Sequence, residues 1–312
     1  MTIVTHEIEL FSETEFHGEL PPRHLGQILA RIQPAAQAAV AMAFRNRSST
    51  PGQLPGWLRR ASDVRFLGFS GNGSTRLQFA APKLEDAARK LYEQRELFET
   101  RPTGQDSALD LLTDTLTDVA AGNENSDRFD RPLLHKITGF RKALSGPFSR
   151  LSVLGDRRPP GQISPEVIQT ARRLSASTPP ARRVRIVGKL DSLSDSRQTF
   201  ELLMDTGARV RGVLLEGSMG TLANLFRGLV LIFGHAHFRP SGELLRVDAD
   251  EFRLAGEADQ FFAKVPTPIA QRKAKPGTTE REKMAKGLKS IMGQWPGEET
   301  DEQVELALRG IG

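Results

Sequence analysis

The chain has 312 residues, of which 38% are hydrophobic and 26% charged, and its net charge is +5. This composition is typical of a globular protein with one or two hydrophobic cores, and it excludes an intrinsically disordered chain. Because the sequence has no cysteine and no apolar run long enough to cross a bilayer, disulfides, thiolate zinc sites and membrane spans are excluded as well.

The N-terminal residues MTIVTHEIELF predict a strand. They lack the basic stretch and apolar core of a signal peptide, so we expect a cytoplasmic protein with no membrane partner. The positive net charge permits attraction to nucleic acid or to acidic proteins without requiring it.

Residues 1–176 are expected to form an α+β domain of unknown role, in which helices are mixed with a hairpin. Residues 22–44 are rich in Ala, Leu and Ile, and Pro34 is expected to divide them into two helical pieces because proline interrupts the hydrogen-bond ladder. Residues 64–82 place two extended runs around Gly71-Asn72-Gly73. Since Asn-Gly between such runs is a strong turn signal, this segment predicts a hairpin.

Further helices are expected in the same domain. Ser164-Pro165-Glu166 predicts a helix start, because serine caps, proline fits the first turn and a carboxylate complements the positive helix end. That helix is expected to end near Leu174. The other predicted helices span residues 83–97, 106–121 and 131–144.

The paired prolines within residues 177–183 predict a domain boundary. After it, short alternating runs predict three strands, a short helix over residues 220–227 and two further strands. This element order resembles the OB-fold, a small five-stranded Greek-key barrel. The resemblance covers residues 183–254, for which a five-stranded barrel of another topology is the alternative.

Basic residues on the predicted barrel suggest a surface for DNA or RNA, because the OB-fold resemblance implies a ligand face near them. The barrel has few aromatic residues, and several of them must fill its core, so a solvated basic face is the alternative interpretation. The candidate nucleic-acid-binding residues are Arg183, Arg185, Lys189, Arg197, Arg209 and Arg211.

Two pairs of potential metal ligands stand at strand spacing, His235 with His237 and Asp248 with Asp250. Two ligands do not make a metal site, and both pairs are expected on the solvated face of the barrel. The other histidines are scattered and no nucleophile motif accompanies them. We therefore expect a non-enzymatic protein with no catalytic residue, no metal site and no cofactor.

Residues 255–277 are expected to hold a short helix over residues 258–271, broken by Pro266 and Pro268, and then a basic linker. Residues 278–312 predict an amphipathic tail of two short helices on either side of Trp295. Isolated helices of this length are marginally stable in water, so the tail needs a surface, which is either its own protein or a partner.

The tail segment IMGQWPGEETDEQVELALRGI, residues 291–311, resembles the C-terminal tails of bacterial antitoxins that neutralise PIN-domain ribonuclease toxins. The resemblance implies that the tail wraps a toxin and blocks its acidic, magnesium-binding nuclease site, with Arg309 as the candidate cation. The chain departs from such antitoxins because a large globular body precedes the tail. The expected partner-binding residues are Met284, Leu288, Ile291, Trp295, Pro296, Gly297, Val304, Leu308, Arg309 and Ile311.

Overall fold

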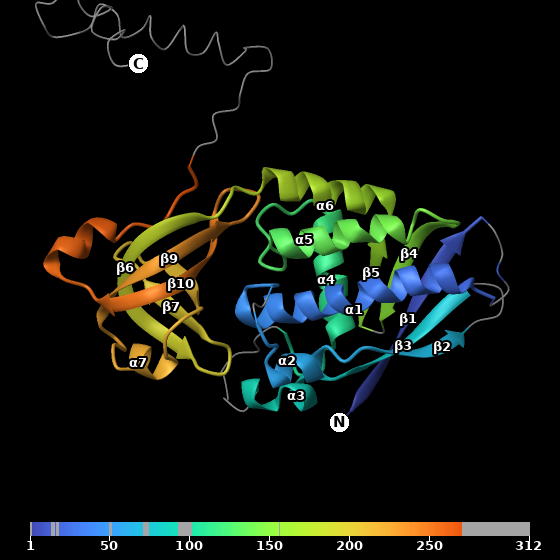
Figure 1. The fold of residues 1–312 in the computed structure, drawn as a ribbon, viewed down its shortest axis with the longest axis horizontal. Helices are drawn as coiled ribbons and strands as arrows, with labels where there is room; N and C mark the ends of the chain where they lie inside the picture. The colour runs from blue at the N-terminus through green and yellow to red at the C-terminus, as the bar shows by residue number, and fades with distance from the viewer. Residues whose placement is uncertain are drawn as a thin grey trace, which may run out of the picture. The chain divides into compact units, whose positions relative to one another are not determined.

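Two hydrophobic cores organise the residues that the structure describes. The computed structural model describes residues 2–13, 16, 19–49, 52–70, 75–92, 102–155 and 157–269. One core lies between a sheet and a group of helices in the first part of the chain, and the other fills a barrel (Figure 1). This mixture of helices and strands confirms the predicted α+β class.

A five-stranded antiparallel sheet contributes to the first core, in the order β2-β3-β1-β4-β5. On β1, Ile8 and Leu10 are buried, because side chains on one face of a strand recur at every second residue. The strands are β1 (Ile3–Ser12), β2 (Arg65–Ser70), β3 (Thr75–Pro82), β4 (Phe148–Gly155) and β5 (Arg158–Ile163).

The hairpin predicted for residues 64–82 is confirmed, since β2 and β3 pair in antiparallel register as far as Ser70 and Arg76. The hairpin of β4 and β5 is absent from the sequence predictions. Two consecutive prolines, Pro159 and Pro160, disfavour a strand in general, but β5 lies at the edge of the sheet, where a missing N–H donor is tolerated.

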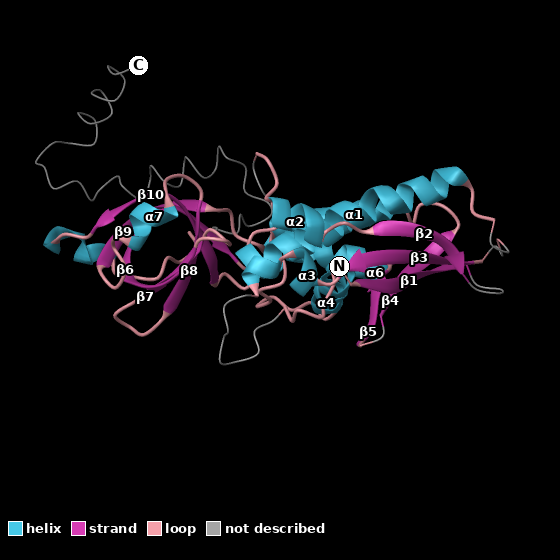
Figure 2. Cartoon of the chain, turned by 90° about the horizontal axis from the view of Figure 1, so that it is seen from below, coloured by secondary structure: helices cyan, strands magenta, loops and turns pink. Residues whose placement is uncertain are grey.

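The helices of the first core gather beside this sheet (Figure 2). The prediction that Pro34 divides residues 22–44 is wrong, because α1 runs without interruption from Pro22 to Arg45. An internal proline costs about 3 kcal/mol. Pro34 is exposed, while a long face of the helix, including Ala35, Ala36 and Ala39, is fully buried, so packing outweighs the lost hydrogen bond.

Local capping signals place the other helices well. The side chain of Ser164 accepts a hydrogen bond from the backbone N–H of Val167, as expected for the cap of α6. Residues 84–91 form only two short turns, so the predicted helix over 83–97 is interrupted there, and residues 93–97 lie outside the described residues. The helices are α1 (Pro22–Arg45), α2 (Gly56–Ala61), α3 (Leu84–Ala87), α4 (Ala108–Ala120), α5 (Arg131–Thr138) and α6 (Pro165–Ser177), with 3-10 helices η1 (Arg89–Leu91) and η2 (Gly139–Lys142).

The second core fills a closed five-stranded barrel, and its elements follow the predicted order of three strands, a helix and two strands. Strands pair in the order β10-β8-β7-β6-β9, and the barrel closes where β10 pairs with β9 in antiparallel and with β8 in parallel orientation. The elements are β6 (Arg182–Ser194), β7 (Thr199–Leu203), β8 (Arg209–Leu214), α7 (Met219–Ala223), β9 (Leu229–Phe238) and β10 (Leu244–Leu254).

Strand β10 also belongs to the first core. Its Leu245 is buried in the cluster that includes α1, and the neighbouring Arg246 is 2% exposed. The guanidinium of Arg246 donates to the carbonyl of Asn46 at 2.7 Å and to the carboxylate of Asp248 at 2.7 Å. A buried apolar side chain and a buried cation thus connect the barrel to the helices.

A 3-10 helix, η3 (Glu257–Phe262), follows the barrel. The predicted helix over residues 258–271 is therefore wrong in type and extent, because residues 263–269, with Pro266 and Pro268, have no helical structure. Residues 270 and 271 lie outside the described residues. None of the helices in the described ranges has the length and apolar character needed to cross a membrane.

Candidate nucleic-acid interface

A basic groove runs along the first strand of the barrel. It has a volume of about 460 Å³, and its walls are the start of β6, the aromatic end of η3 and the residues that follow η3. Among the described residues, no carboxylate lines it. We call this the β6 groove, defined by Arg182, Arg183, Arg185, Phe261, Phe262 and Lys264.

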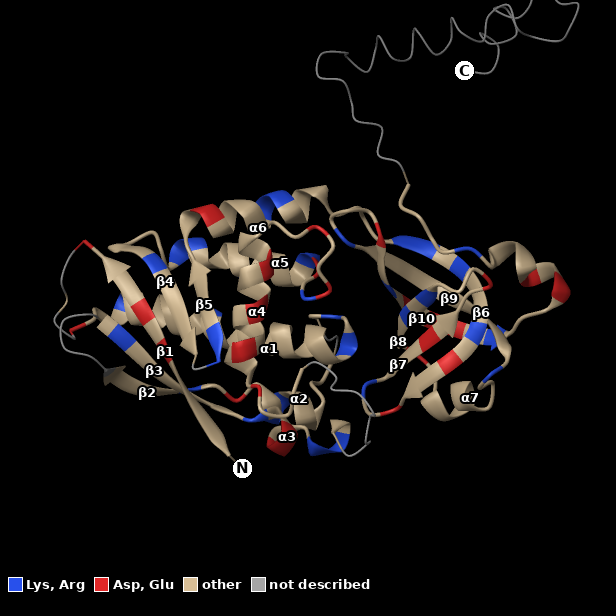
Figure 3. Ribbon diagram, turned by 180° about the vertical axis from the view of Figure 1, so that it is seen from behind, with Lys and Arg blue, Asp and Glu red and all other residues tan. Residues whose placement is uncertain are grey.

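Strand periodicity explains why the arginines of β6 face outwards. Val184 and Ile186 are buried in the barrel core, and Arg183 and Arg185 alternate with them on the solvent side. Figure 3 shows the resulting basic positions in blue on β6. Within the described ranges, Arg183 has no carboxylate beside it in the groove, and the buried Nε of Arg182 has no hydrogen-bond partner.

Aromatic rings lie next to these cations. The guanidinium carbon of Arg185 lies 5.5 Å from the ring centre of Phe233 and 5.6 Å from that of Phe262, a separation at which cation–π attraction operates. The ammonium of Lys264 lies 5.8 Å from the ring of Phe261. Phe261 is 78% exposed, so one face of an aromatic ring stays open to solvent beside positive charge.

Asp259 fixes the helix that presents these rings. Its carboxylate accepts hydrogen bonds from the guanidinium of Arg253 at 2.7 Å and from the backbone N–H of Gly256 at 2.8 Å. These two bonds, with the nearby charge of Arg185, hold the pKa of Asp259 below its usual value. Asp259 therefore remains ionised and bonded to Arg253, and it does not form an ion pair with Arg185.

Two of the other predicted cations are neutralised by carboxylates. Arg209 forms ion pairs with Asp191 at 3.0 Å and with Glu201 at 3.3 Å. Arg211 forms ion pairs with Asp127 at 3.2 Å and with Glu201 at 3.4 Å. These arginines lie on β8, which is separated from β6 by β7 in the barrel.

The remaining two candidates are also apart from the groove. Arg197 is half-buried, with its guanidinium 5.7 Å from the ring of Phe44 and one N–H donated to the carbonyl of Leu91. Lys189 is exposed on β6 beyond the groove. The structure thus brings Arg183 and Arg185 together with aromatic residues, and it does not bring the six predicted cations onto one face.

Sequence reasoning overlooked Phe261, Phe262 and Lys264. The sequence predicted a helix over residues 258–271 but not which residues it contacts. It also predicted that the barrel ends at residue 254, before these side chains. The available signal was the adjacent pair Phe261-Phe262 followed closely by a lysine. Every residue expected to bind a partner in the tail, from Met284 to Ile311, lies outside the described residues.

The histidine and aspartate pairs on β9 and β10 do face each other. His237 Nε2 lies 3.1 Å from Asp248, and His235 Nδ1 lies 3.4 Å from Asp250. Asp248 is buried, contrary to the expected solvated position, and it also accepts from Arg246. Burial alone would raise the pKa of Asp248, but His237 and Arg246 outweigh it and lower that pKa. The part of the chain that the structure describes contains no group of three or more side chains suited to a metal ion.

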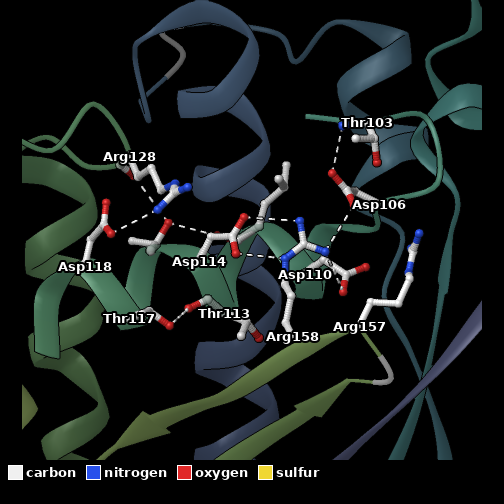
Figure 4. A network of polar contacts seen from close by, with 12 residues as sticks. Thr103, Asp106, Asp110, Thr113, Asp114, Thr117, Asp118, Arg128, Arg157 and Arg158 are labelled. Carbon is white, nitrogen blue, oxygen red and sulfur yellow. Dashed lines mark hydrogen bonds and ion pairs between the residues drawn. The ribbon is translucent and has the colours of Figure 1, made fainter. Parts of the chain in front are cut away.

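Figure 4 shows a second cluster of carboxylates, on α4 and in the residues just before it. Arg158 binds Asp106 at 3.1 Å, Asp110 at 3.2 Å and Asp114 at 2.8 Å. Burial opposes the charge on Arg158, but the hydrogen bonds that it donates to Asp114 and Asp106 outweigh this effect and raise the pKa of the guanidinium. These carboxylates are engaged by an arginine, which is the arrangement of a structural ion cluster.

A Ser, a His and an Asp also meet at the start of α4, without the geometry of a nucleophile. Ser107 is fully buried, and its hydroxyl donates to Asp110 at 2.9 Å and lies 2.8 Å from Nε2 of His6. The same hydroxyl accepts from the backbone N–H of Asp110, which makes Ser107 the cap of the helix. The hydroxyl therefore stabilises a helix end instead of facing a substrate.

No family model matches the chain, and comparisons with curated proteins and with solved structures find no similar protein.

Proposed function

We propose that this chain binds nucleic acid in the β6 groove. The observation that carries the proposal is the exposed ring of Phe261 beside Arg183 and Arg185, two cations that lack carboxylate ion pairs in the described residues. Cations neutralise phosphates, and an open aromatic face stacks on an unpaired base. Both requirements of a single-stranded ligand meet in one groove.

The barrel supports this proposal. Its five closed strands, with a helix between the third and fourth, resemble the OB-fold, a frequent carrier of oligonucleotide sites. OB-folds usually bind on their second and third strands, whereas the β6 groove lies on the first strand, so the resemblance supports the class of ligand and not the position of the groove. Base stacking requires a base that is free of its duplex partner, so single-stranded DNA or RNA suits the groove better than a duplex. Cation contacts with the backbone predict weak sequence preference and strong salt dependence.

The test compares two double variants of equal charge. Arg183→Gln with Arg185→Gln removes two cations of the groove, and Arg209→Gln with Arg211→Gln removes two that are already neutralised by Glu201, Asp191 and Asp127. Binding of a fluorescent oligothymidylate is measured at several salt concentrations. Affinity falls as salt rises, and we expect the first pair to make this fall less steep, by about 0.7 in the slope of log affinity against log salt per lost contact. The second pair should leave the slope nearly unchanged.

Equal losses in both double variants would show that only net charge matters and would refute the groove. Flat binding curves for single-stranded DNA and RNA with the unmodified protein would remove the function altogether. Circular dichroism melts of all variants establish that any loss of affinity does not reflect unfolding.

A second candidate function rests on the tail. The stretch from Trp295 to Ile311 resembles antitoxin tails, and its apolar residues recur at helical spacing. We propose on this basis that the tail binds and inhibits a PIN-type ribonuclease. The proposal depends on sequence alone.

The test of the second function uses a PIN-domain ribonuclease encoded by the neighbouring gene. Co-purification and inhibition of its RNA cleavage are expected for the full chain, and Trp295→Ala with Leu308→Asp should abolish both. A chain truncated after Gly277 that still inhibits the ribonuclease would refute the role of the tail. A neighbouring gene of another kind would leave nucleic-acid binding as the better candidate.

A further inference from the structure

A second basic region lies on the first core, in a cleft beside α5. The cleft has a volume of about 640 Å³, which falls within the range of small-molecule sites. It is bordered by the middle of α1, by residues that follow α1 and by one face of α5. We call it the α5 cleft, defined by Gln37, Ser49, Leu54, Arg131, His135 and Lys136.

Three basic side chains from α5 line this cleft. Arg131, His135 and Lys136 are exposed and all line the cleft. Arg131 and His135, four residues apart, are neighbours on one helix face, and Lys136 follows His135 on the adjoining side of the helix. The Nε of Arg131 donates to the carbonyl of Ser175 at 3.3 Å, which leaves its terminal N–H groups available. The ammonium of Lys136 has no ion pair in the described ranges, and no described carboxylate lines the cleft.

The carboxylate that precedes Arg131 in the sequence is buried and bonded to other groups. Asp130 accepts hydrogen bonds from the backbone N–H of Ser48 at 3.1 Å and from that of Leu133 at 3.2 Å. It also forms a buried ion pair with Arg246 at 3.2 Å. Because Asp130 is saturated by these groups, the charge of Arg131 is not compensated by its neighbour.

The rest of the lining is apolar with a few donors. Leu54, Ala38 and Pro132 provide apolar surface, and the amide of Gln37 and the hydroxyl of Ser49 provide neutral hydrogen-bonding groups. A ligand that suits this lining combines an anionic head with a less polar body. Arginine and lysine together are common partners of phosphate, since the first offers paired N–H donors and the second a compact charge.

We propose that the α5 cleft binds the phosphate group of an organic phosphate, with Arg131 and Lys136 as the principal contacts. Gln37 and Ser49 donate to the remaining oxygens, and the organic part lies against Leu54 and Pro132. This site is separate from the β6 groove and does not depend on the proposed function of the barrel. The phosphate belongs either to a small molecule or to a nucleic-acid strand.

The test measures binding of phenyl phosphate and of pyrophosphate by titration calorimetry with the full chain. Arg131→Gln with Lys136→Gln should weaken binding about tenfold or more, since two charge-assisted contacts are lost. The matched control is Arg141→Gln with Lys142→Gln, which removes the same two residue types from the adjacent η2, outside the cleft. Should the first double variant fold poorly, Lys136→Glu alone replaces it, because this side chain is exposed.

An oligothymidylate arm distinguishes the two sources of phosphate. Loss of phenyl phosphate binding only in the cleft variant supports a small-molecule site. Loss of oligothymidylate affinity only in the cleft variant, without measurable binding of either small probe, assigns the phosphate to a strand. Equal effects of the cleft and control variants on every probe would overturn the proposal. So would the absence of binding of every probe up to about 10 mM, a concentration at which even a complex with a millimolar Kd is detected.

Discussion

The guanidinium of Arg246 on β10 lies 3.2 Å from the carboxylate of Asp130, the residue that caps α5. Arg246 is 2% exposed, so this ion pair is buried. The same carboxylate accepts from the backbone N–H of Leu133, which fixes the helix start. One aspartate therefore serves as a helix cap and as the counter-ion that connects the barrel to the first core.

Replacement of this arginine should destabilise the protein strongly. Arg246→Met removes the cation and leaves Asp130 buried without its ion-pair partner, while Asp248 keeps His237 and Arg47. We expect a loss of about 3–5 kcal/mol, because a buried carboxylate is left uncompensated. Urea unfolding followed by circular dichroism measures the free energy of unfolding. The control Arg209→Gln breaks only exposed ion pairs and should cost less than about 1 kcal/mol. A loss for Arg246→Met as small as that of the control would contradict the structural role of the ion pair.

Asp248 should make the stability depend on acid. Because its folded pKa is lower than its unfolded value of about 3.9, its ionised form stabilises the folded state at any pH above that value. This contribution declines as the pH falls below about 4 and disappears only below the folded pKa. The difference in unfolding free energy between the unmodified protein and Asp248→Asn should thus shrink between about pH 5 and pH 2.

The control for this pH series is Glu216→Gln, which removes an exposed carboxylate. Its effect on the unfolding free energy should be small and nearly constant over the same range. A difference for Asp248→Asn that stays constant from neutral to acidic pH would refute the assigned role of Asp248.

Gly234 should tolerate no side chain. A Cβ atom there would lie 2.1 Å from the carbonyl oxygen of Asp248, a backbone atom of the paired strand, so β9 and β10 would have to separate. We expect Gly234→Ala to reduce the unfolding free energy by at least about 2 kcal/mol. Gly26→Ala is the matched control, because Gly26 lies in α1 with no atom near its added Cβ, and alanine should stabilise the helix by about 0.5–1 kcal/mol. Identical melting temperatures for the two variants would contradict the close strand approach.

Phe261 should affect ligand affinity without affecting stability. Since its ring is 78% exposed, Phe261→Ala should leave the melting temperature nearly unchanged. Loss of one stacked base predicts a decrease in affinity for oligothymidylate of about 1–3 kcal/mol, measured by fluorescence anisotropy. Phe226→Ala removes another exposed ring, 46% accessible and outside the β6 groove, and should not change affinity. A similar decrease in both variants would argue against stacking in the groove.

Much of the local structure follows from the sequence alone. Asn72-Gly73 between extended runs identified the hairpin of β2 and β3, and Ser164 identified the start of α6. Alternation of Val184 and Ile186 with arginines identified both the strand β6 and the outward face of its cations. These signals act over a few residues, through turn geometry, capping and side-chain periodicity, so no knowledge of the remaining chain is needed to interpret them.

Tertiary structure decided which of these local features carry an interface. Pro34 remains inside α1 because the surrounding core packs on the helix, and the local cost of proline does not reveal that packing. Arg211 is neutralised by Asp127, which is 84 residues distant in the sequence, whereas Arg185 lies beside Phe262 from η3. Sequence alone determined that β6 and β8 carry arginines on their outer faces. Only the fold decided which of those charges remain free of ion pairs. Ion pairs and ring contacts depend on distances between segments that are far apart in the sequence and meet only in the folded chain.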